Sequence, residues 1–420
     1  MEEAAALDVT PLLAPREGVP PVTETAAQLA EVVARFAAGT GPVAVDAERA
    51  SGYRYSQRAY LVQLRREGSG SALIDPVACP DLSLLSKVLQ DAPWVLHAAN
   101  QDIPCLAEVG MTAPALFDTE LAGRLAGFER VGLGAMVENV LGYALEKGHS
   151  AADWSTRPLP HDWLVYAALD VEVLLELRDA LESELDQQGK LGWALEEFEA
   201  VRTAPAPGPR VDPWRRTSGI HRLRTRRQLA GVQAMWEARD ILARRRDTAP
   251  GRILPDAAIV NAVSTAPATP ADLLALPVFG GRSTRRHVDL WWGALQKAAT
   301  LPDDQLPMSA PAGDGPPAPN RWAERDPVAA RRLGRVRTAV QGISEAQRVP
   351  AENLVAPDAV RRLAWTPPAE PSEEAVAAAL AAHGARPWQV GLVAAALAAA
   401  LPEPADDPAA QPAAEPADEA

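Results

Sequence analysis

The sequence predicts an α/β domain built on a mixed sheet, followed by two all-helical modules. Four short apolar segments have the composition of strands, at about residues 42–48, 58–65, 71–75 and 94–98. Helical patterns lie among and after them, over residues 23–38, near 81–91 and in a series from 103 to 200 that includes 133–141 and 161–187. Strands that alternate with helices are typical of a sheet with helices on its faces.

Two proline-rich stretches divide the rest of the chain. Residues 204–209 read Ala-Pro-Ala-Pro-Gly-Pro, and residues 307–319 are similarly rich in Pro and Gly. The tail combines Ala, Pro and acids with no aromatic residue, a composition typical of disorder. The expected organisation is a flexible arm at 1–22, the α/β domain at 23–203, a linker at 204–213, a helical domain at 214–300, a linker at 307–320, a second helical domain at 321–401 and a disordered tail at 402–420.

Residues 43–48 read Val-Ala-Val-Asp-Ala-Glu, an apolar strand that ends in two carboxylates. Because side chains alternate along a strand, Asp46 and Glu48 point to the same side. Two like charges held this close repel each other, and a bound cation relieves the repulsion. Carboxylate oxygens suit Mg²⁺ or Mn²⁺ rather than zinc. Taken alone, the pair is equally compatible with chance placement on a surface strand.

Two further segments carry acids. Residues 94–102 read as a buried strand that runs into a helix start, with Asp102 just past the strand. Residues 163–171 have a helical composition, and Tyr166 and Asp170 are four residues apart, so they lie on one helix face. Together with the first pair, these acids can surround two divalent metal ions, Mg²⁺ or Mn²⁺. Such a centre suits displacement at phosphorus.

These motifs resemble the DEDD superfamily of 3′→5′ exonucleases and, within it, the ribonuclease D family. The first motif is Asp46-Ala47-Glu48, the second runs from His97 to Asp102, and the third runs from Tyr166 to Asp170. In the histidine subclass, four residues separate a His from the last Asp of the motif. The corresponding position here is Val165, which is not a histidine. The tyrosine subclass is therefore indicated.

The resemblance implies a fold and a set of roles. The fold is a ribonuclease H-like exonuclease core followed by helical domains of the HRDC type. The four acids, Asp46, Glu48, Asp102 and Asp170, are metal ligands, and Tyr166 orients or helps to deprotonate the attacking water. The alternative for Tyr166 is an aromatic residue that packs the helix on the sheet. His97 is expected to have its hydrogen bonds satisfied within the core or beside the metal ligands, without contacting the metal.

A loop before the third motif carries cations and an aromatic residue. Lys147, Trp154 and Arg157 could hold a terminal phosphate or stack on a base. The alternative is a packed loop in which Trp154 is an anchor and Arg157 pairs with Asp153. Gln63 either faces the active-site end of its strand or sits at a sheet edge.

The region after the first linker resembles an HRDC domain, through the pattern around Leu229, Trp236, Ile253-Leu254-Pro255 and Leu273-Leu274. Its arginines form a possible binding surface for a nucleic-acid backbone, with a solvated helix face as the alternative. The surface comprises Arg222, Arg224, Arg226, Arg227, Arg244, Arg245 and Arg246, with Arg285 and Arg286 as a possible extension. Residues 321–401 resemble a diverged second HRDC-like repeat.

Charge is distributed unevenly along the chain. The net charge of the whole chain is −14, but residues 210–297 hold 16 Lys and Arg against seven Asp and Glu, a net +9. A basic segment beside an acidic, metal-binding segment is the distribution expected of a module that binds phosphates.

The remaining expectations concern location and substrate. No apolar run is long enough to span a bilayer, the first residues lack signal-peptide features, and two cysteines suit a reducing cytoplasm. The resemblance implies a metal-dependent exoribonuclease that releases nucleoside 5′-monophosphates from RNA 3′ ends, with tRNA precursors as a substrate class. The protein is expected to act as a monomer, without a membrane. Two alternatives remain: a DNA 3′→5′ exonuclease, and an inactive nucleic-acid-binding protein.

Overall fold

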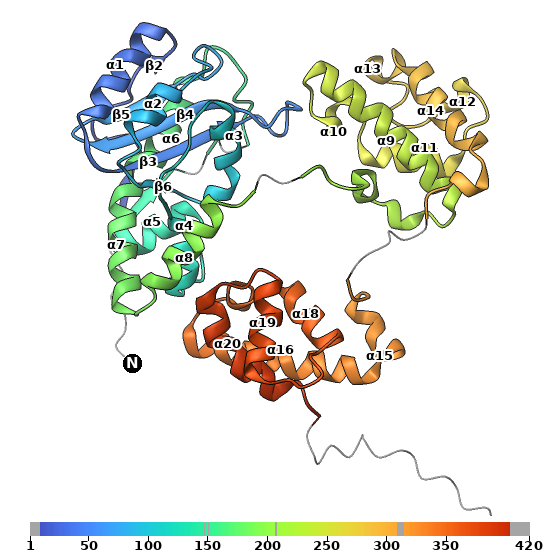
Figure 1. Ribbon diagram of the computed structural model, residues 1–420. Coiled ribbons are helices and arrows are strands. Elements are labelled where there is room, and N and C mark those ends of the chain that lie inside the picture. Colours follow the sequence, from blue (N-terminus) through green and yellow to red (C-terminus); the bar gives the residue numbers. More distant parts are fainter. Residues whose placement is uncertain (1–8, 147, 150, 206–207, 309–314, 404–420) are drawn as a thin grey trace, which may run out of the picture.

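The computed structural model describes residues 9–146, 148–149, 151–205, 208–308 and 315–403, which form an α/β domain and two helical modules (Figure 1). The predicted fold class is confirmed. The expectations for Lys147 and for a disordered tail over 404–420 lie outside the described residues. Within the described ranges, no helix is both long enough and apolar enough to cross a bilayer.

The α/β domain is built on a six-stranded mixed sheet in the order β2-β5-β4-β3-β6-β7. Its strands are β2 (Val22–Thr23), β3 (Thr40–Arg49), β4 (Ala59–Glu67), β5 (Gly70–Ile74), β6 (Trp94–Leu96) and β7 (Leu116–Asp118). The β3–β4 and β4–β5 pairs are antiparallel, whereas β2–β5, β3–β6 and β6–β7 are parallel. The four predicted strands correspond to β3, β4, β5 and β6, and β3 has a neighbour on each side.

Helices cover the sheet on its two faces. They are α1 (Ala26–Ala37), α2 (Ser83–Val88), α3 (Ile103–Glu108), α4 (Thr119–Ala126), α5 (Leu133–Leu141), α6 (His161–Glu172), α7 (Leu174–Gln187) and α8 (Leu191–Arg202), with the 3₁₀ turn η1 (Ala99–Gln101). Thr25 and Gln28 form a capping box that starts α1. The helix predicted over 161–187 divides at Val173, and its first part, α6, lies against β3, β4 and β5.

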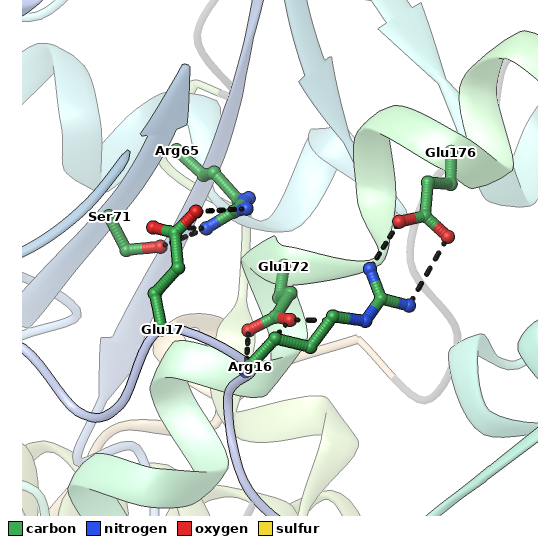
Figure 2. Close-up of polar contacts among 6 residues, drawn as sticks. All are labelled: Arg16, Glu17, Arg65, Ser71, Glu172 and Glu176. Carbon is green, nitrogen blue, oxygen red and sulfur yellow. Dashed lines mark hydrogen bonds and ion pairs between the residues drawn. The ribbon is translucent and has the colours of Figure 1, made fainter. Parts of the chain in front are cut away.

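Residues 9–22 are part of the fold, which differs from the flexible arm expected over residues 1–22; residues 1–8 lie outside the described ranges. Strand β1 (Thr10–Leu12) pairs in parallel with β8 (Tyr143–Leu145). The backbone N–H of Arg16 donates to the carboxylate of Glu172 at the end of α6, 3.0 Å away, and its guanidinium contacts Glu176 (Figure 2). Nearby, Arg65 bridges Glu17 and Ser71. The difference arises because the partners of this segment lie from 48 to more than 150 residues away in the sequence.

The first helical module has its own apolar core. Its elements are η2 (Pro213–Arg216), η3 (Ile220–Arg222), α9 (Arg226–Arg246), α10 (Pro250–Ile253), α11 (Asp256–Thr265), α12 (Pro270–Ala275), α13 (Arg282–Arg285), α14 (Val288–Thr300) and η4 (Asp303–Gln305). Val232 and Met235 on α9 pack with Ile259 and Trp291, all fully buried. A capping box between Thr225 and Gln228 begins α9.

The second helical module shares one apolar core with the α/β domain. Its elements are η5 (Pro319–Arg321), α15 (Trp322–Arg325), α16 (Pro327–Gln347), α17 (Ala351–Leu354), α18 (Pro357–Trp365), α19 (Glu373–Ala382) and α20 (Pro387–Ala400). The rings of Trp388 and Trp193 stack with centroids 5.1 Å apart, and the Trp388 indole donates to Glu197 at 2.9 Å. The buried Lys190 ammonium donates to the carbonyls of Leu125 and Gln347. This module is therefore a structural part of the α/β domain.

This shared core predicts that one tryptophan stabilises both parts. Trp388→Ala removes a buried ring and leaves the Glu197 carboxylate without its indole donor, so we expect the free energy of unfolding to fall by about 3–5 kcal/mol. Urea unfolding followed by circular dichroism measures it. Leu195→Ala, at an exposed position on α8, is the control and should change stability by less than about 0.5 kcal/mol. Equal stability of the two variants would contradict a shared core.

Candidate active site

Strand β3 presents two carboxylates on one face of the sheet. Asp46 lies opposite Gln63 on β4, and Glu48 lies opposite Leu61, so all four side chains share that face. Val45 and Ala47, on the other face, belong to the main apolar core. The parity predicted from the sequence is therefore present, and β3 is an interior strand rather than a surface strand.

Helix α6 brings the third carboxylate to this face. Carboxylate oxygens of Asp46, Glu48 and Asp170 all lie within 4.8 Å of one another. Tyr166 lies one turn before Asp170, close enough for the two groups to influence each other's pKa. Both residues line a cavity of about 470 Å³, which His149, His161 and other residues of the neighbouring loop also border. The helical spacing thus places tyrosine and carboxylate at one opening.

Asp102 reaches the same region from η1 but lies outside this group of three. Its carboxylate is 3.5 Å from the guanidinium of Arg49, the last residue of β3. The preceding turn contains Ala98 in a left-handed conformation, φ 59°. The buried Asp118 carboxylate accepts hydrogen bonds from the backbone of Ala98 and Ala99, at 3.0 and 2.9 Å. Asp118 therefore holds the turn that delivers Asp102.

Sequence reasoning missed Asp118 and Arg49. Asp118 could have been found as a helix N-cap, because it also accepts from the backbone N–H groups of Glu120 and Leu121 at the start of α4. For Gln63 the sequence leaves two positions open, the active-site end of its strand and a sheet edge. The structure places it on an interior strand, fully buried, and not at a sheet edge.

Burial raises the pKa of every acid in the cluster, and repulsion by neighbouring carboxylates adds to it for Glu48, Asp102 and Asp170. Desolvation is the main cause for Asp46 and Asp170, and for Glu48 the charges of Asp46, Asp170 and Asp102 add to it, so that its pKa lies well above the usual range. Desolvation, followed by the Asp46 charge, raises the pKa of Asp102 to about 8. Such a cluster is costly to ionise without a compensating positive charge.

The donor set fits divalent cations. All candidate ligands are carboxylate oxygens, as hard cations such as Mg²⁺ and Mn²⁺ require. Neither polar atom of the Gln63 side chain has a partner among the described residues, although Gln63 lies beside Asp46. A buried amide without partners is expected where an ion or its bound water completes the site. These observations agree with metal use by this cluster.

Burial, followed by the charges of Asp170, Glu48 and Asp46, raises the pKa of Tyr166 far above its ordinary value. The phenol therefore keeps its proton at neutral pH in the metal-free protein. His97 is neutral as well: burial lowers its pKa to about 4, and its Nδ1 lies 2.9 Å from the Thr119 hydroxyl. These contacts agree with the expected satisfied histidine.

The loop before α6 is packed, which favours the packed-loop alternative for Trp154 and Arg157 over contact with nucleic acid. The Trp154 side chain is fully buried, and its indole donates to the carbonyl of His149. Arg157 makes two hydrogen bonds to Asp75, at 2.7 and 2.8 Å, and one to the Tyr60 carbonyl. Trp154 is thus enclosed by the protein, and the Arg157 guanidinium already binds partners remote in sequence. The alternative of a packed loop holds, with Asp75 rather than Asp153 as the partner of the arginine.

The predicted arginine surface is also divided. Arg226 donates to the carbonyls of Leu306 and Pro307, and Arg227 to carbonyls near the end of α14 and to Asp303, so both serve the fold of the module. The remaining members are exposed at the two ends of α9: Arg222 and Arg224 before it, and Arg244, Arg245 and Arg246 in its last turn.

Comparison with known proteins identifies the domains. Family models match residues 21–186 as a 3′-5′ exonuclease, residues 228–295 as an HRDC domain and residues 315–401 as a 3′ to 5′ exonuclease C-terminal domain. The last covers the stretch that resembles a second HRDC-like repeat, and its description ties that stretch to the exonuclease, in agreement with the shared core.

Curated relatives decide the family. Over 288 residues the chain is 33% identical to ribonuclease D of Escherichia coli, which is 67% of this chain and 75% of that protein. Over 315 residues it is 32% identical to ribonuclease D of Acidiphilium cryptum, 71% and 78% of the two chains. The chain belongs to the ribonuclease D family. It is a 3′→5′ exonuclease of that family, and the predicted resemblance is confirmed.

Solved structures agree. The crystal structure of Escherichia coli ribonuclease D is similar over 91% of this chain and 98% of that one, with a TM-score of 0.66 and 27% identity. A protein from Bifidobacterium adolescentis is similar over 94% and 99%, with a TM-score of 0.85 and 38% identity. For five curated members of the family, the part aligned with this chain covers 61% to 78% of the relative's own length.

The buried carboxylates predict a pH-dependent response to metal. Because the pKa of Asp102 is raised to about 8, the metal-free folded chain binds more protons than the unfolded chain between the ordinary aspartate range and about pH 8. Stability from this group is present at low pH and is lost as the pH rises through that window. A cation must displace these protons, so the increase in Tm caused by Mn²⁺ should be larger above pH 8 than near pH 6. Differential scanning calorimetry measures it.

An Asp46→Asn variant is the control for this measurement, since it should lose most of the Mn²⁺-induced increase at either pH. An increase of the same size at both pH values in the unmodified protein would show that the cation does not compete with protons at these carboxylates.

Proposed function

We propose that this exonuclease acts on RNA: it removes nucleotides from RNA 3′ ends and releases nucleoside 5′-monophosphates, with tRNA precursors among its substrates. The convergence of Asp46, Glu48 and Asp170 under α6, with Asp102 and Tyr166 beside them, carries the proposal. The solved relative from Escherichia coli, an exoribonuclease involved in structured RNA processing, supports the choice of RNA.

Asp46, Glu48, Asp102 and Asp170 are the proposed ligands of two divalent ions, Mg²⁺ or Mn²⁺. When bound, such ions supply an ionised water as nucleophile and neutralise the charge that develops on the leaving 3′ oxygen. The proposed role of the Tyr166 hydroxyl is to orient the attacking water by a hydrogen bond or to help deprotonate it. The cavity beside Tyr166 and Asp170 gives the terminal nucleotide room next to these groups.

The exposed arginines of the HRDC domain are the proposed contacts to the RNA backbone. Phosphate contacts position a strand without reading its sequence, which suits an enzyme that removes any nucleotide. We further infer that the protein acts as a monomer in the cytoplasm; Cys79 and Cys105, both buried and unpaired, suit a reducing compartment.

The decisive experiment digests 5′-labelled RNA and DNA of one sequence with Mg²⁺ or Mn²⁺. We expect a stepwise ladder from RNA that EDTA abolishes and that Asp46→Asn lacks, because the ligand set is then incomplete. Asp179→Asn, an exposed carboxylate on the following helix α7 and away from the cavity, is the matched control and should keep the ladder. A ladder from DNA alone would replace RNA by DNA as the substrate. Binding without a ladder on either would indicate an inactive binding protein.

Tyr166→Phe separates orientation from metal binding. Loss of the hydroxyl should lower kcat on RNA by roughly 100-fold, within the range for a positioned proton-handling group. The Mn²⁺-induced increase in Tm should remain, since the carboxylates are intact. Single-turnover kinetics and calorimetry measure the two quantities. An unchanged kcat would assign Tyr166 to packing alone.

A further inference from the structure

The HRDC domain is docked on the exonuclease domain through the loop between β3 and β4, residues 50–58. The Tyr55 hydroxyl donates to Asp240 on α9 at 3.0 Å, and the backbone N–H of Ser56 donates to Asp247 at 2.9 Å. The backbone N–H of Ala249 donates to the Tyr53 carbonyl, also at 2.9 Å. We call this contact the docking bridge; it joins the loop to the C-terminal end of α9.

Further contacts reinforce the docking bridge. Arg252 donates to the Gly52 carbonyl at 2.8 Å and lies over the Tyr53 ring, 4.0 Å from its centroid. The Tyr55 ring packs against the apolar core of the HRDC domain. Main-chain hydrogen bonds, a cation–π contact and apolar packing thus occur together at this contact. Two domains joined only by a flexible linker would not need such contacts.

The docking bridge begins at the edge of the active site. Ala50 follows Glu48 by two residues, and Arg49 between them contacts Asp102. Tyr53 is five residues from Glu48, so at 3.3–3.6 Å per residue their Cα atoms are at most about 18 Å apart. An RNA strand bound on the HRDC side of the docking bridge is therefore within a few nucleotides of the carboxylates.

The end of α9 at the docking bridge is strongly basic. Arg244, with 70% of its side chain exposed, pairs with Asp240. Arg245 and Arg246 are exposed, and their guanidinium groups make no hydrogen bond or ion pair with any described residue. Arg245, Arg246 and Arg286 all act on His287: burial, then the charges of Arg246, Arg245 and Arg286, lowers the pKa of His287. Arg54 and Arg58 stand on the loop itself. The acidic side chains of the contact are Asp240 and Asp247, so the basic groups prevail.

The other basic end of α9 is far away. Arg222 and Arg224 precede a helix of 21 residues. At 1.5 Å per residue the helix is about 30 Å long, so these arginines are about that far from the docking bridge. The sequence-based prediction placed all of these arginines on one surface, whereas in the structure the length of the helix separates the two groups.

We propose that the RNA strand enters the active site across the docking bridge, with the phosphates upstream of the scissile bond on Arg245, Arg246 and Arg286, and that docking through Tyr55 and Asp247 sets their distance from the carboxylates. The proposal rests on RNA as the substrate of the proposed function. It assigns binding to one end of α9 and gives the β3–β4 loop a positioning role.

The test measures binding of a fluorescent single-stranded RNA to the full chain in EDTA, over a range of salt concentrations. Each phosphate contact to a single strand contributes about 0.7 to the slope of log K against log[salt]. Arg245→Ala with Arg246→Ala should therefore flatten the slope by roughly 1.4 and weaken binding at moderate salt by about tenfold or more. The matched control is Arg325→Ala with Arg337→Ala, two exposed arginines of the C-terminal module, which should leave the slope unchanged.

Arg222→Ala with Arg224→Ala tests the competing path along the whole helix. We expect a smaller change in slope than at the other end. A flattening as large as that of the Arg245 and Arg246 pair would overturn the proposal, because the strand would then follow the length of α9.

A third arm tests docking itself. Tyr55→Phe with Asp247→Ala weakens the docking bridge but leaves Arg245 and Arg246 in place. If docking positions them, the effect of removing the two arginines should shrink in this background, so that a double-mutant cycle on RNA affinity is non-additive. Calorimetry of each variant checks folding. Additive effects would overturn the positioning role.

These outcomes are distinguishable from failure of the proposed function. Loss of hydrolysis on RNA with any metal, while binding still depends on Arg245 and Arg246, would refute the exoribonuclease and leave the entry path standing. Normal hydrolysis with binding insensitive to those arginines would do the reverse.

Discussion

The burial of several like charges on one face of the central sheet is the constraint on which the rest of this structure depends. Asp46, Glu48 and Asp170 are brought within 4.8 Å of one another beneath a helix, in surroundings that raise the pKa of each. An arrangement of this kind destabilises the metal-free fold, and proteins accept such conflicts at functional sites when other parts hold the backbone in place. Here β3, paired on both sides, provides one rigid wall and α6 provides the other.

The parts that hold α6 come from distant stretches of the chain. Its last residue, Glu172, is buried and accepts hydrogen bonds from the Arg16 backbone, so the N-terminal segment fastens the end of the catalytic helix (Figure 2). The C-terminal module extends the main apolar core over α8, and the hydrogen bond from Trp388 to Glu197 joins the module to that helix. Residues from both ends of the sequence thus support a site built from its first 170 residues.

Local periodicity explains what could be predicted from the sequence. The parity of Asp46 and Glu48 and the spacing of Tyr166 and Asp170 follow from strand and helix geometry, and the structure brings these four together. What could not be predicted concerns side chains whose partners are remote in sequence. Arg157 binds Asp75, 82 residues away, and Arg226 binds carbonyls 80 residues away, so both have structural roles that the local sequence does not indicate. Asp118 was missed because its role depends on a turn around Ala98 that only the folded chain reveals.

The separation of charge along the chain acquires a physical meaning from the docking bridge. An acidic site repels the phosphate backbone that it must approach, and cations bound within it offset that repulsion only at short range, since salt screens charges beyond about 8–10 Å. Positive charge fixed at the edge of the site acts where the strand arrives. The docked end of α9 supplies it, and because Tyr55 and Asp247 hold that end by directed hydrogen bonds, the arginines are fixed relative to Glu48 rather than carried on a free linker. The HRDC domain then does more than raise the local concentration of RNA: it defines the direction from which the 3′ end enters.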